Sequence, residues 1–322
     1  MRWWARPGFW LSLAVVVVAA LLPATTGSAS AREAVFTILV SVALASSLNM
    51  LLGYAGYVSF GHIVFFGLGG YVGFYAVSVH GWHLSAAVLA GAAASGVLAL
   101  LLGMSILRLR GAYFALATIG INEAMKALAT NLDAFGGSTG MEMHLRAYQP
   151  YGGAARALWI TYWALCGVTV LAVVASFLVK RSRFGLALLT IREDEDAAAV
   201  LGVDATRAKT LAYVLSAVFP GAVGALYFFK SASIEPGGAF RLHFSIELLV
   251  MIMLGGQGTL LGPILGAAAY QKLRSTLLTS AAFRDVQLVV AGALLLAIVL
   301  FVPAGAVGWL RSRSRLLHKA LE

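Results

Sequence analysis

Charge and cysteine are scarce in this sequence. Only 11% of its 322 residues are charged, against about 25% in a typical soluble domain, whereas 61% are hydrophobic. This composition excludes an ordinary soluble enzyme. The single cysteine, Cys166, excludes an intrachain disulfide and a multi-cysteine metal site. Because Cys166 lies inside an apolar run, we interpret it as a packing residue.

Motifs for covalent chemistry are also missing. The chain contains no G-x-x-x-x-G-K-[ST] sequence, so it does not bind ATP through the phosphate-binding loop that this motif forms. Ser59 and His62 are close in sequence, but nothing beside them supplies the oxyanion hole that a serine hydrolase needs. We therefore predict that the chain is not an enzyme and binds no cofactor itself.

Long apolar runs fill most of the chain instead. A bilayer is spanned by about 20 apolar residues, and runs of this order recur from Phe9 to Pro303. They predict an all-α membrane protein, a polytopic helical bundle in which residues 1–322 form a single domain. We expect about ten transmembrane segments, near residues 8–24, 34–53, 61–79, 84–107, 113–131, 158–179, 210–230, 246–256, 259–277 and 286–303.

The basic residues predict the orientation. Although the net charge is +10, Lys and Arg occur in short clusters between apolar runs, which is typical of cytoplasmic loops and not of a nucleic-acid-binding surface. The N-terminus and the basic tail with Arg311 and Arg313 are both predicted to be cytoplasmic, so residues 246–277 have to cross the membrane twice. Residues 1–31 fit either a retained span or a cleaved signal peptide.

Two loops and two glycine-rich breaks interrupt the apolar runs. Residues 132–157 are predicted to form a polar external loop, and residues 180–209 the one long cytoplasmic loop, which is rich in charge. Glycines break the apolar segments 51–71 and 253–270 in a similar way. Irregular backbone at membrane depth needs protein or a wet cavity to satisfy it, so the breaks either line a substrate path or allow close helix packing.

The cytoplasmic loop contains a motif for contact with another protein. Asp196, Ala197 and Ala198 are followed by Gly202, which is similar to the EAA-x-x-x-G loop of ABC importer permeases, with Asp in place of Glu. Small side chains let such a helix lie close to a partner, and flanking charges fix its register. The residues expected to couple to an ATPase are Arg192, Glu193, Asp194, Asp196, Ala197, Ala198 and Gly202.

Four longer segments resemble the branched-chain amino-acid permease family of ABC importers. They occur in the family's order, cover most of residues 45–303, and include SLNMLLGYAGYVSFGHIVFFGLGGY (47–71) and SIELLVMIMLGGQGTLLGPILGAA (245–268). The other two are residues 107–132 and 183–227. The LRLRG junction and the external GG-x-x-G loop are similar to the larger type of the family's two paired permeases.

The resemblance implies a complete importer around this chain in the bacterial inner membrane. Its other parts would be a second related permease, two cytoplasmic ATPase subunits that bind ATP and Mg, and a periplasmic substrate-binding protein. The solute would be a branched-chain or related hydrophobic amino acid, although relatives also carry urea or amides. Tyr57 stands where many relatives carry Gln, which leaves the solute open.

Polar residues in the predicted spans and breaks are candidates for the substrate pathway, because a polar group inside a bilayer has to face protein or water. Glu123 and Lys126 are one turn apart, so an i,i+3 ion pair and a direct role in transport both remain open. Glu247 is expected to cap the helix that it begins. His62 either attracts a carboxylate at the first break or packs there. The candidates are Asn49, Tyr57, Ser59, His62, Asn122, Glu123, Glu247 and Gln257.

Two other functions fit the same composition. A stand-alone secondary transporter would relay an ion through Glu123, Lys126 or His62, whereas a membrane scaffold would transport nothing. Dependence of uptake on a partner ATPase separates these functions from the importer.

Overall fold

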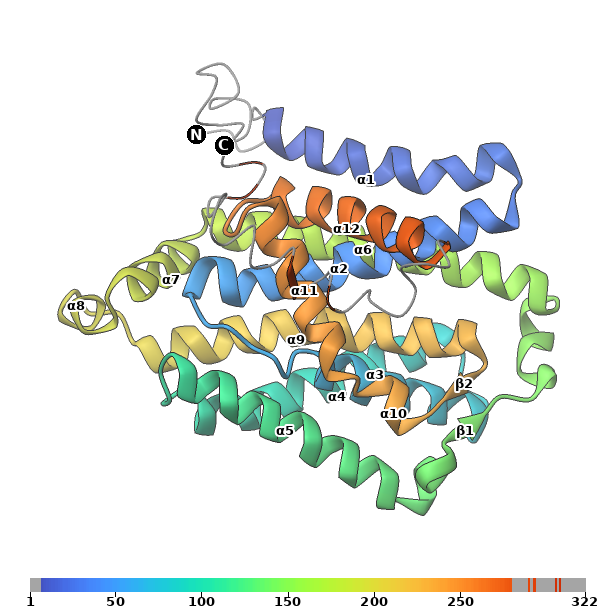
Figure 1. The fold of residues 1–322 in the computed structure, drawn as a ribbon. Helices are drawn as coiled ribbons and strands as arrows, with labels where there is room; N and C mark the ends of the chain where they lie inside the picture. Colours follow the sequence, from blue (N-terminus) through green and yellow to red (C-terminus); the bar gives the residue numbers. More distant parts are fainter. Residues whose placement is uncertain (1–6, 280–288, 290–291, 294–304, 306, 308–322) are drawn as a thin grey trace.

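The computed structural model describes residues 7–279, 289, 292–293, 305 and 307, and the described part is a bundle of helices (Figure 1). This confirms the predicted all-α class. The helices are α1 (Pro7–Thr26), α2 (Ala29–Ala55), α3 (Ile63–Ser78), α4 (Leu84–Ile106), α5 (Ala112–Asn131), α6 (Ala154–Arg181), α7 (Arg183–Glu193), α8 (Glu195–Val200), α9 (Ala205–Ser231), α10 (Pro236–Ala239), α11 (Leu242–Gly255) and α12 (Leu261–Thr279).

The predicted spans coincide with helices except for the last, near 286–303, most of which lies outside the described residues. Of the described helical segments, 6 are long and apolar enough to cross a membrane: α1, α2, α4, α6, α9 and the stretch Pro236–Gly255. Helix α3 is apolar but shorter. The estimate of ten crossings is therefore only approximate.

Helix α2 lies at the centre of the bundle. Ser28 caps its start by accepting a hydrogen bond from the Ala31 N–H, and Gly56 ends it in the left-handed region at φ +78°. Every residue from Leu39 to Ala55 is buried, because α6, α9, α11 and α12 pack around it. An all-round buried helix holds no amphipathic stripe, so its few polar side chains have to bond to neighbouring helices.

Close packing explains the glycines of α3. Gly69 lies against the backbone of Gly221 in α9, and Gly73 lies against Ala225 one turn further along the same helix. A side chain at either glycine would collide with α9, so the small residues let the two backbones approach each other. For this part of segment 51–71, the structure favours close packing over the lining of a path.

The predicted external loop 132–157 is ordered by short elements. It forms the 3-10 turns η2 (Asp133–Phe135), η3 (Gly137–Thr139) and η4 (Leu145–Tyr151) and the strand β1 (Met141–Glu142). Strand β1 pairs antiparallel with β2 (Ser233–Ile234), with Met141 opposite Ile234. The pairing fixes the loop against the segment that joins α9 to α11.

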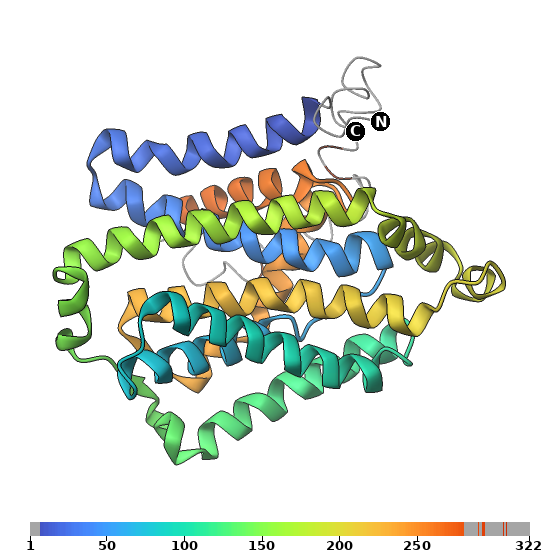
Figure 2. The same ribbon diagram turned by 180° about the vertical axis from the view of Figure 1, so that it is seen from behind.

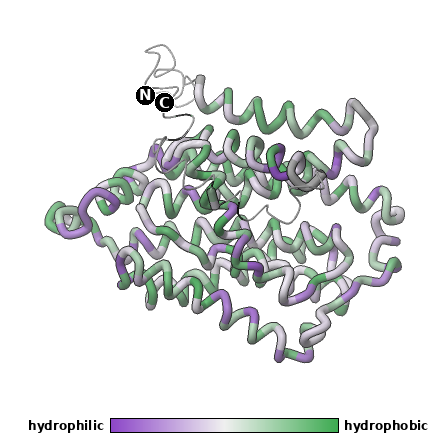
Figure 3. The backbone as a smooth tube through the Cα atoms, viewed as in Figure 1, coloured by the Kyte–Doolittle hydropathy of each residue, from purple (hydrophilic) through white to green (hydrophobic). Residues whose placement is uncertain are grey.

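The ribbon has two polar ends. Helices α7 and α8 project from one end, and β1, β2 and the 3-10 turns lie at the other, while Figure 2 shows α4 and α6 on the face opposite α11. Hydrophilic stretches gather toward these ends, and hydrophobic ones run along the helices between them (Figure 3). Exposed apolar side chains such as Val18, Leu89 and Leu101 cover the outside of the bundle, as contact with lipid requires.

Candidate functional site

Lys209 is the centre of a buried polar network at the α8 end of the molecule. Only 2% of its side chain is exposed, and its ammonium makes three hydrogen bonds. It donates to Glu195 Oε1 at 2.6 Å, to the Tyr57 hydroxyl at 2.9 Å and to the Leu107 carbonyl at 2.8 Å. A buried ammonium has three donors to satisfy, and these partners satisfy all of them.

Arg110 extends this network to the surface. Its guanidinium lies 3.3 Å from Glu195 Oε2, to which the Tyr57 hydroxyl also donates at 3.0 Å. It donates as well to Asp196 Oδ1 at 2.9 Å, and this hydrogen bond, followed by the positive charge, lowers the pKa of the Asp196 carboxyl. We call Tyr57, Arg110, Glu195, Asp196 and Lys209 the Lys209 network.

The network fixes the short helix α8. Asp194 caps the helix by accepting hydrogen bonds from the N–H groups of Asp196 and Ala197, at 2.9 and 3.0 Å. Ala198 is buried in the protein's own core, so it does not offer the contact surface that the motif predicted. Glu193, by contrast, is exposed at the end of α7.

The end of α8 and the two residues that follow it are apolar and exposed. Val200 is 89% exposed and Leu201 75% exposed, and Gly202 follows with φ +85° and open space around it. We call Val200, Leu201 and Gly202 the α8 tip. A large exposed apolar tip at the polar end of a membrane protein is typical of a docking point for another protein.

A second set of polar contacts joins α7 to the end of α2 and to the break after α11. Arg192 of α7 donates from Nη1 to the Gly53 carbonyl at 2.7 Å. From the break, Gln257 donates to the Leu52 carbonyl at 2.9 Å. Asn49 accepts from the Gly258 N–H and donates to the Thr259 carbonyl, both at 3.0 Å.

These contacts make a joint between three elements, and we call Asn49, Gly53, Arg192, Gln257 and Gly258 the α2 joint. Asn49 and Gln257, which the sequence placed among the pathway candidates, hold the irregular backbone of the second break. Gly53 allows the approach, because a side chain there would meet both Asn49 and the Gly258 backbone. Buried amides used in this way satisfy backbone groups that lipid would leave unpaired.

Three further pathway candidates are buried between helices. His62 Nε2 lies 3.1 Å from the Ser47 hydroxyl, and Asn122 donates to the Phe240 carbonyl at 3.0 Å. Ser59 is fully buried in the same stretch as His62. None of the three lies on the wall of the pocket described below.

Glu123 lies on an exposed face of α5, and Lys126 is half-buried. The i,i+3 ion pair, one of the two alternatives left open by the sequence, is not formed among the described residues. The i,i+3 spacing permits such a pair but does not enforce it, because each side chain also reaches the surface of the helix.

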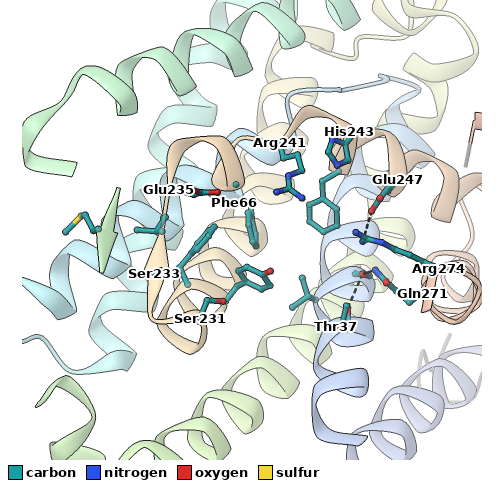
Figure 4. Close-up of a pocket in the computed structure, with 18 of the residues that line it drawn as sticks. Thr37, Phe66, Ser231, Ser233, Glu235, Arg241, His243, Glu247, Gln271 and Arg274 are labelled. Atoms are coloured by element: carbon teal, nitrogen blue, oxygen red, sulfur yellow. Dashed lines mark hydrogen bonds and ion pairs between the residues drawn. The ribbon is translucent and has the colours of Figure 1, made fainter. Parts of the chain in front are cut away.

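The other polar site is a pocket of about 500 Å³ near β1 and β2 (Figure 4). Its walls come from α2, α3, α9, α10, α11 and α12, from the turn η3 and from the two strands. Glu247 is buried at one side of it and accepts a hydrogen bond from Arg274 Nη1 at 3.1 Å. Next to this pair, Gln271 donates to the Ser41 hydroxyl at 2.6 Å.

The expected capping role of Glu247 is wrong. Helix α11 begins at Leu242, with Arg241 in the cap position, so Glu247 lies more than a turn inside it. The predicted span began at residue 246 because hydropathy rises there, whereas the helix starts in the more polar residues before it. The carboxylate is therefore free to face the pocket and pair with Arg274.

Sequence reasoning missed Glu195, Lys209, Arg110, Arg241 and Arg274. Arg274 had a usable indication, since a charge inside a predicted span is costly and has to face protein or water. Two of the three partners of Lys209 lie far away in sequence, at residues 57 and 107, and Glu195 is 14 residues away, so no helical spacing indicated that Lys209 is buried. Over the described ranges, no group of three or more His, Cys, Asp or Glu side chains is placed to hold a metal ion.

Comparisons with known proteins agree with this architecture. The profile of the family described as "Branched-chain amino acid transport system / permease component" matches residues 30–299. The chain is 27% identical to the high-affinity branched-chain amino acid transport system permease protein LivM of Salmonella typhimurium, over 94% of this chain and 76% of that one. Its identity to the LivM of Escherichia coli is 28%, over 96% of this chain and 77% of that one.

A third relative matches a shorter part of the chain. A probable branched-chain amino acid transport permease protein LivM of Methanocaldococcus jannaschii is 24% identical over 51% of this chain and 47% of its own length. No solved structure is significantly similar to the chain. Because the family profile covers most of the sequence, including both polar sites, the chain belongs to the family of branched-chain amino acid transport system permease components.

Proposed function

We propose that this chain is the membrane-spanning subunit of an ATP-driven importer that moves branched-chain or related hydrophobic amino acids into the cell. The names of the relatives support the solute class. The observation that supports the ATP-driven mechanism most strongly is that two sets of polar contacts tie neighbouring residues of the α7–α8 segment to the bundle: Glu195 bonds to Lys209 of α9, and Arg192 bonds to Gly53 beside the second glycine break. A passive scaffold needs no such connection between this segment and a break inside the bundle.

In this mechanism the α8 tip docks on a cytoplasmic ATPase. Movement of α8 displaces Glu195, and its ion pair with Lys209 passes the displacement to α9. Movement of α7 displaces Arg192, whose hydrogen bond to Gly53 passes it to α2 and the second break. Rocking of α2 and α9 against the remaining helices then alternates access to the solute path.

The proposal also gives each partner of the complex a surface on this chain. A second, related permease is proposed on the exposed face of α5, where Glu123 would be costly against lipid. The periplasmic binding protein is proposed to dock at residues 132–157. Two ATPase subunits, which bind ATP and Mg, are proposed on the cytoplasmic side, where one of them contacts the α8 tip of this chain. The complex lies in a bacterial inner membrane with both termini of this chain in the cytoplasm, and the chain itself binds no cofactor.

Co-purification and uptake test this proposal together. In the complex, Leu201→Asp places a charge on the α8 tip and is expected to lose the ATPase subunits and ATP-driven leucine uptake into proteoliposomes. Leu145→Asp, at an equally exposed leucine near the opposite end, keeps the ATPase subunits bound. Leucine uptake that needs a proton gradient and no ATP would contradict the proposal and favour a secondary transporter.

A further inference from the structure

The pocket between α2 and α11 holds charges of both signs. Besides the Glu247–Arg274 pair, its wall includes Arg241, His243, Glu235 and Glu142. Arg274 and Glu247 neutralise each other within the wall. The remaining charges decide what the pocket attracts.

Arg241 and Glu235 face each other without forming an ion pair. Their guanidinium and carboxylate point toward one another across the pocket in Figure 4, and among the described residues neither has an ion-pair partner within 4.0 Å. Both side chains are exposed to the cavity and its mouth. A separated cation and anion on facing walls match a ligand that has its own two charges.

The backbone holds these two charges apart. Glu235 stands in extended conformation directly before Pro236, which begins α10, and Arg241 is the cap residue of α11. The short helix α10 between them is anchored by buried Pro236 and Ala239. The spacing is therefore set by packing and not by attraction between the side chains.

The rest of the wall combines apolar side chains with the neutral polar groups of Thr37, Ser41, Thr139, Ser231, Ser233 and Gln271. Phe66, Phe228, Phe244 and Val40 line the pocket beside the charged groups. Apolar side chains beside convergent polar groups suit a small molecule that has both an apolar and a charged part, and about 500 Å³ lies within the usual range of small-molecule sites.

We propose that this pocket binds an α-amino acid as a zwitterion, with its carboxylate on Arg241, its ammonium on Glu235 and an apolar side chain against the phenylalanines. This inference deepens the proposed import function and rests on it for the identity of the solute. A guanidinium binds a carboxylate through two parallel hydrogen bonds, which fixes the orientation of the ligand. Urea and simple amides have no charges for Arg241 and Glu235, so the pocket selects against them.

Protection of an introduced cysteine tests the site directly. The full chain is assembled in its complex with Cys166→Ser, and Ser231→Cys places a thiol on the pocket wall, where Ser231 is exposed. L-leucine at about ten times its dissociation constant is expected to slow modification by a water-soluble maleimide about tenfold. Leucinamide, which lacks the carboxylate, and N-acetyl-leucine, which lacks the ammonium, are expected to leave the rate unchanged.

Variants of the two charges complete the test. Arg241→Gln and Glu235→Gln are expected to abolish protection by leucine, while Arg241→Lys keeps part of it. Arg146→Gln, which removes an exposed arginine of η4 outside this pocket, is the matched control and keeps full protection. Each variant is compared with the wild type by its elution in gel filtration, so that loss of folding is recognised.

The outcomes separate this inference from the proposed function. If leucine fails to protect the cysteine while ATP-driven leucine uptake is intact, the pocket assignment is overturned and the importer stands. If leucinamide protects the cysteine as well as leucine does, the proposal that the pocket binds the ligand as a zwitterion is overturned. Protection by leucine without any ATP-driven uptake keeps the pocket and removes the importer.

Discussion

The Lys209 network and the pocket near β1 and β2 use their charges in different ways. At the α8 end, Arg110, Glu195, Asp196 and Lys209 are all paired with one another, and Lys209 is almost fully buried. In the pocket, Arg274 and Glu247 are paired, whereas Arg241 and Glu235 have no ion-pair partner within the part of the chain that the structure describes. Paired charges fix the geometry between elements, while unpaired charges leave room for a ligand.

The helix environments explain this difference. Lys209 lies in the first turns of α9, where α8 and the end of α4 bring an acid and a carbonyl within reach. Leaving any partner out would strand a charge in a medium of low dielectric, which is strongly destabilising. Arg241 and Glu235 are exposed residues of the pocket lining, so neither charge has to be paired within the protein.

Removal of the buried cation Lys209 is expected to lower the stability of the protein more than any other change proposed below. Lys209→Met leaves Glu195 without its main partner and is expected to destabilise the protein by about 3–5 kcal/mol. A large fall in the melting temperature in detergent would show it. Arg207→Met, which removes the exposed arginine of the Arg207–Asp204 pair two residues earlier, is the control and leaves the melting temperature nearly unchanged. If both variants melt alike, the Lys209 network is not a stabilising element.

A methyl group in the α2 joint is expected to have the next largest effect. In Gly53→Ala the new Cβ would lie 2.3 Å from Asn49 Oδ1 and 2.8 Å from the Gly258 nitrogen, so the second break has to move. Overpacking of this kind costs about 1–3 kcal/mol, and it is expected to reduce leucine uptake more than it reduces ATPase activity.

Gly167→Ala is the matched control for this variant. Gly167 is a glycine of α6 with nothing within 4 Å of the added methyl group, so uptake is expected to stay at the wild-type level. An unchanged uptake in Gly53→Ala would show that the joint tolerates displacement, and the proposed link between α2 and the break would then be lost.

The smallest predicted effect is a change in how hydrogen exchange of α8 depends on pH. Because Arg110 lowers the pKa of Asp196, their ion pair contributes stability above the ordinary carboxyl pKa and loses it as pH falls through the lowered pKa. In Arg110→Gln, Asp196 becomes protonated at a higher pH than in the wild type. Hydrogen exchange of residues 195–200, corrected for the intrinsic rate and followed from about pH 6 to about pH 2.5, is expected to rise at a higher pH in the variant than in the wild type. Identical profiles would contradict the role of Arg110.

Local patterns in the sequence predicted most of the fold. Apolar runs predicted the positions of the long helices between α1 and α12. A helix in lipid needs a continuous run of apolar residues, and a window of about 20 residues detects such a run. Charge predicted that residues 180–209 interrupt the bundle, and α7 and α8 are indeed short helices there. Gly255 and Gly258 indicated the second break, which lies between α11 and α12.

The candidate site was harder to predict from the sequence, because its chemistry depends on contacts between distant parts of the chain. Tyr57 was expected on the substrate pathway, but its hydroxyl bonds to Lys209 and Glu195, more than 130 residues away. Ala198 fits a docking motif by sequence, yet the turn of α8 directs it into the core and exposes Val200 instead. Such directions follow from how helices pack and not from the order of residues.

Hydrogen exchange of the second glycine break in the complete complex tests the central claim most directly. The claim is that Arg192 passes motion from α7 to α2 and to residues 256–260. With ATP and vanadate, the wild type is expected to change its exchange both in α7–α8 and in residues 256–260, whereas Arg192→Met changes only in α7–α8. Arg183→Met, at an exposed arginine of the same helix, is expected to behave as the wild type. An equal response of residues 256–260 in Arg192→Met and the wild type would contradict the account.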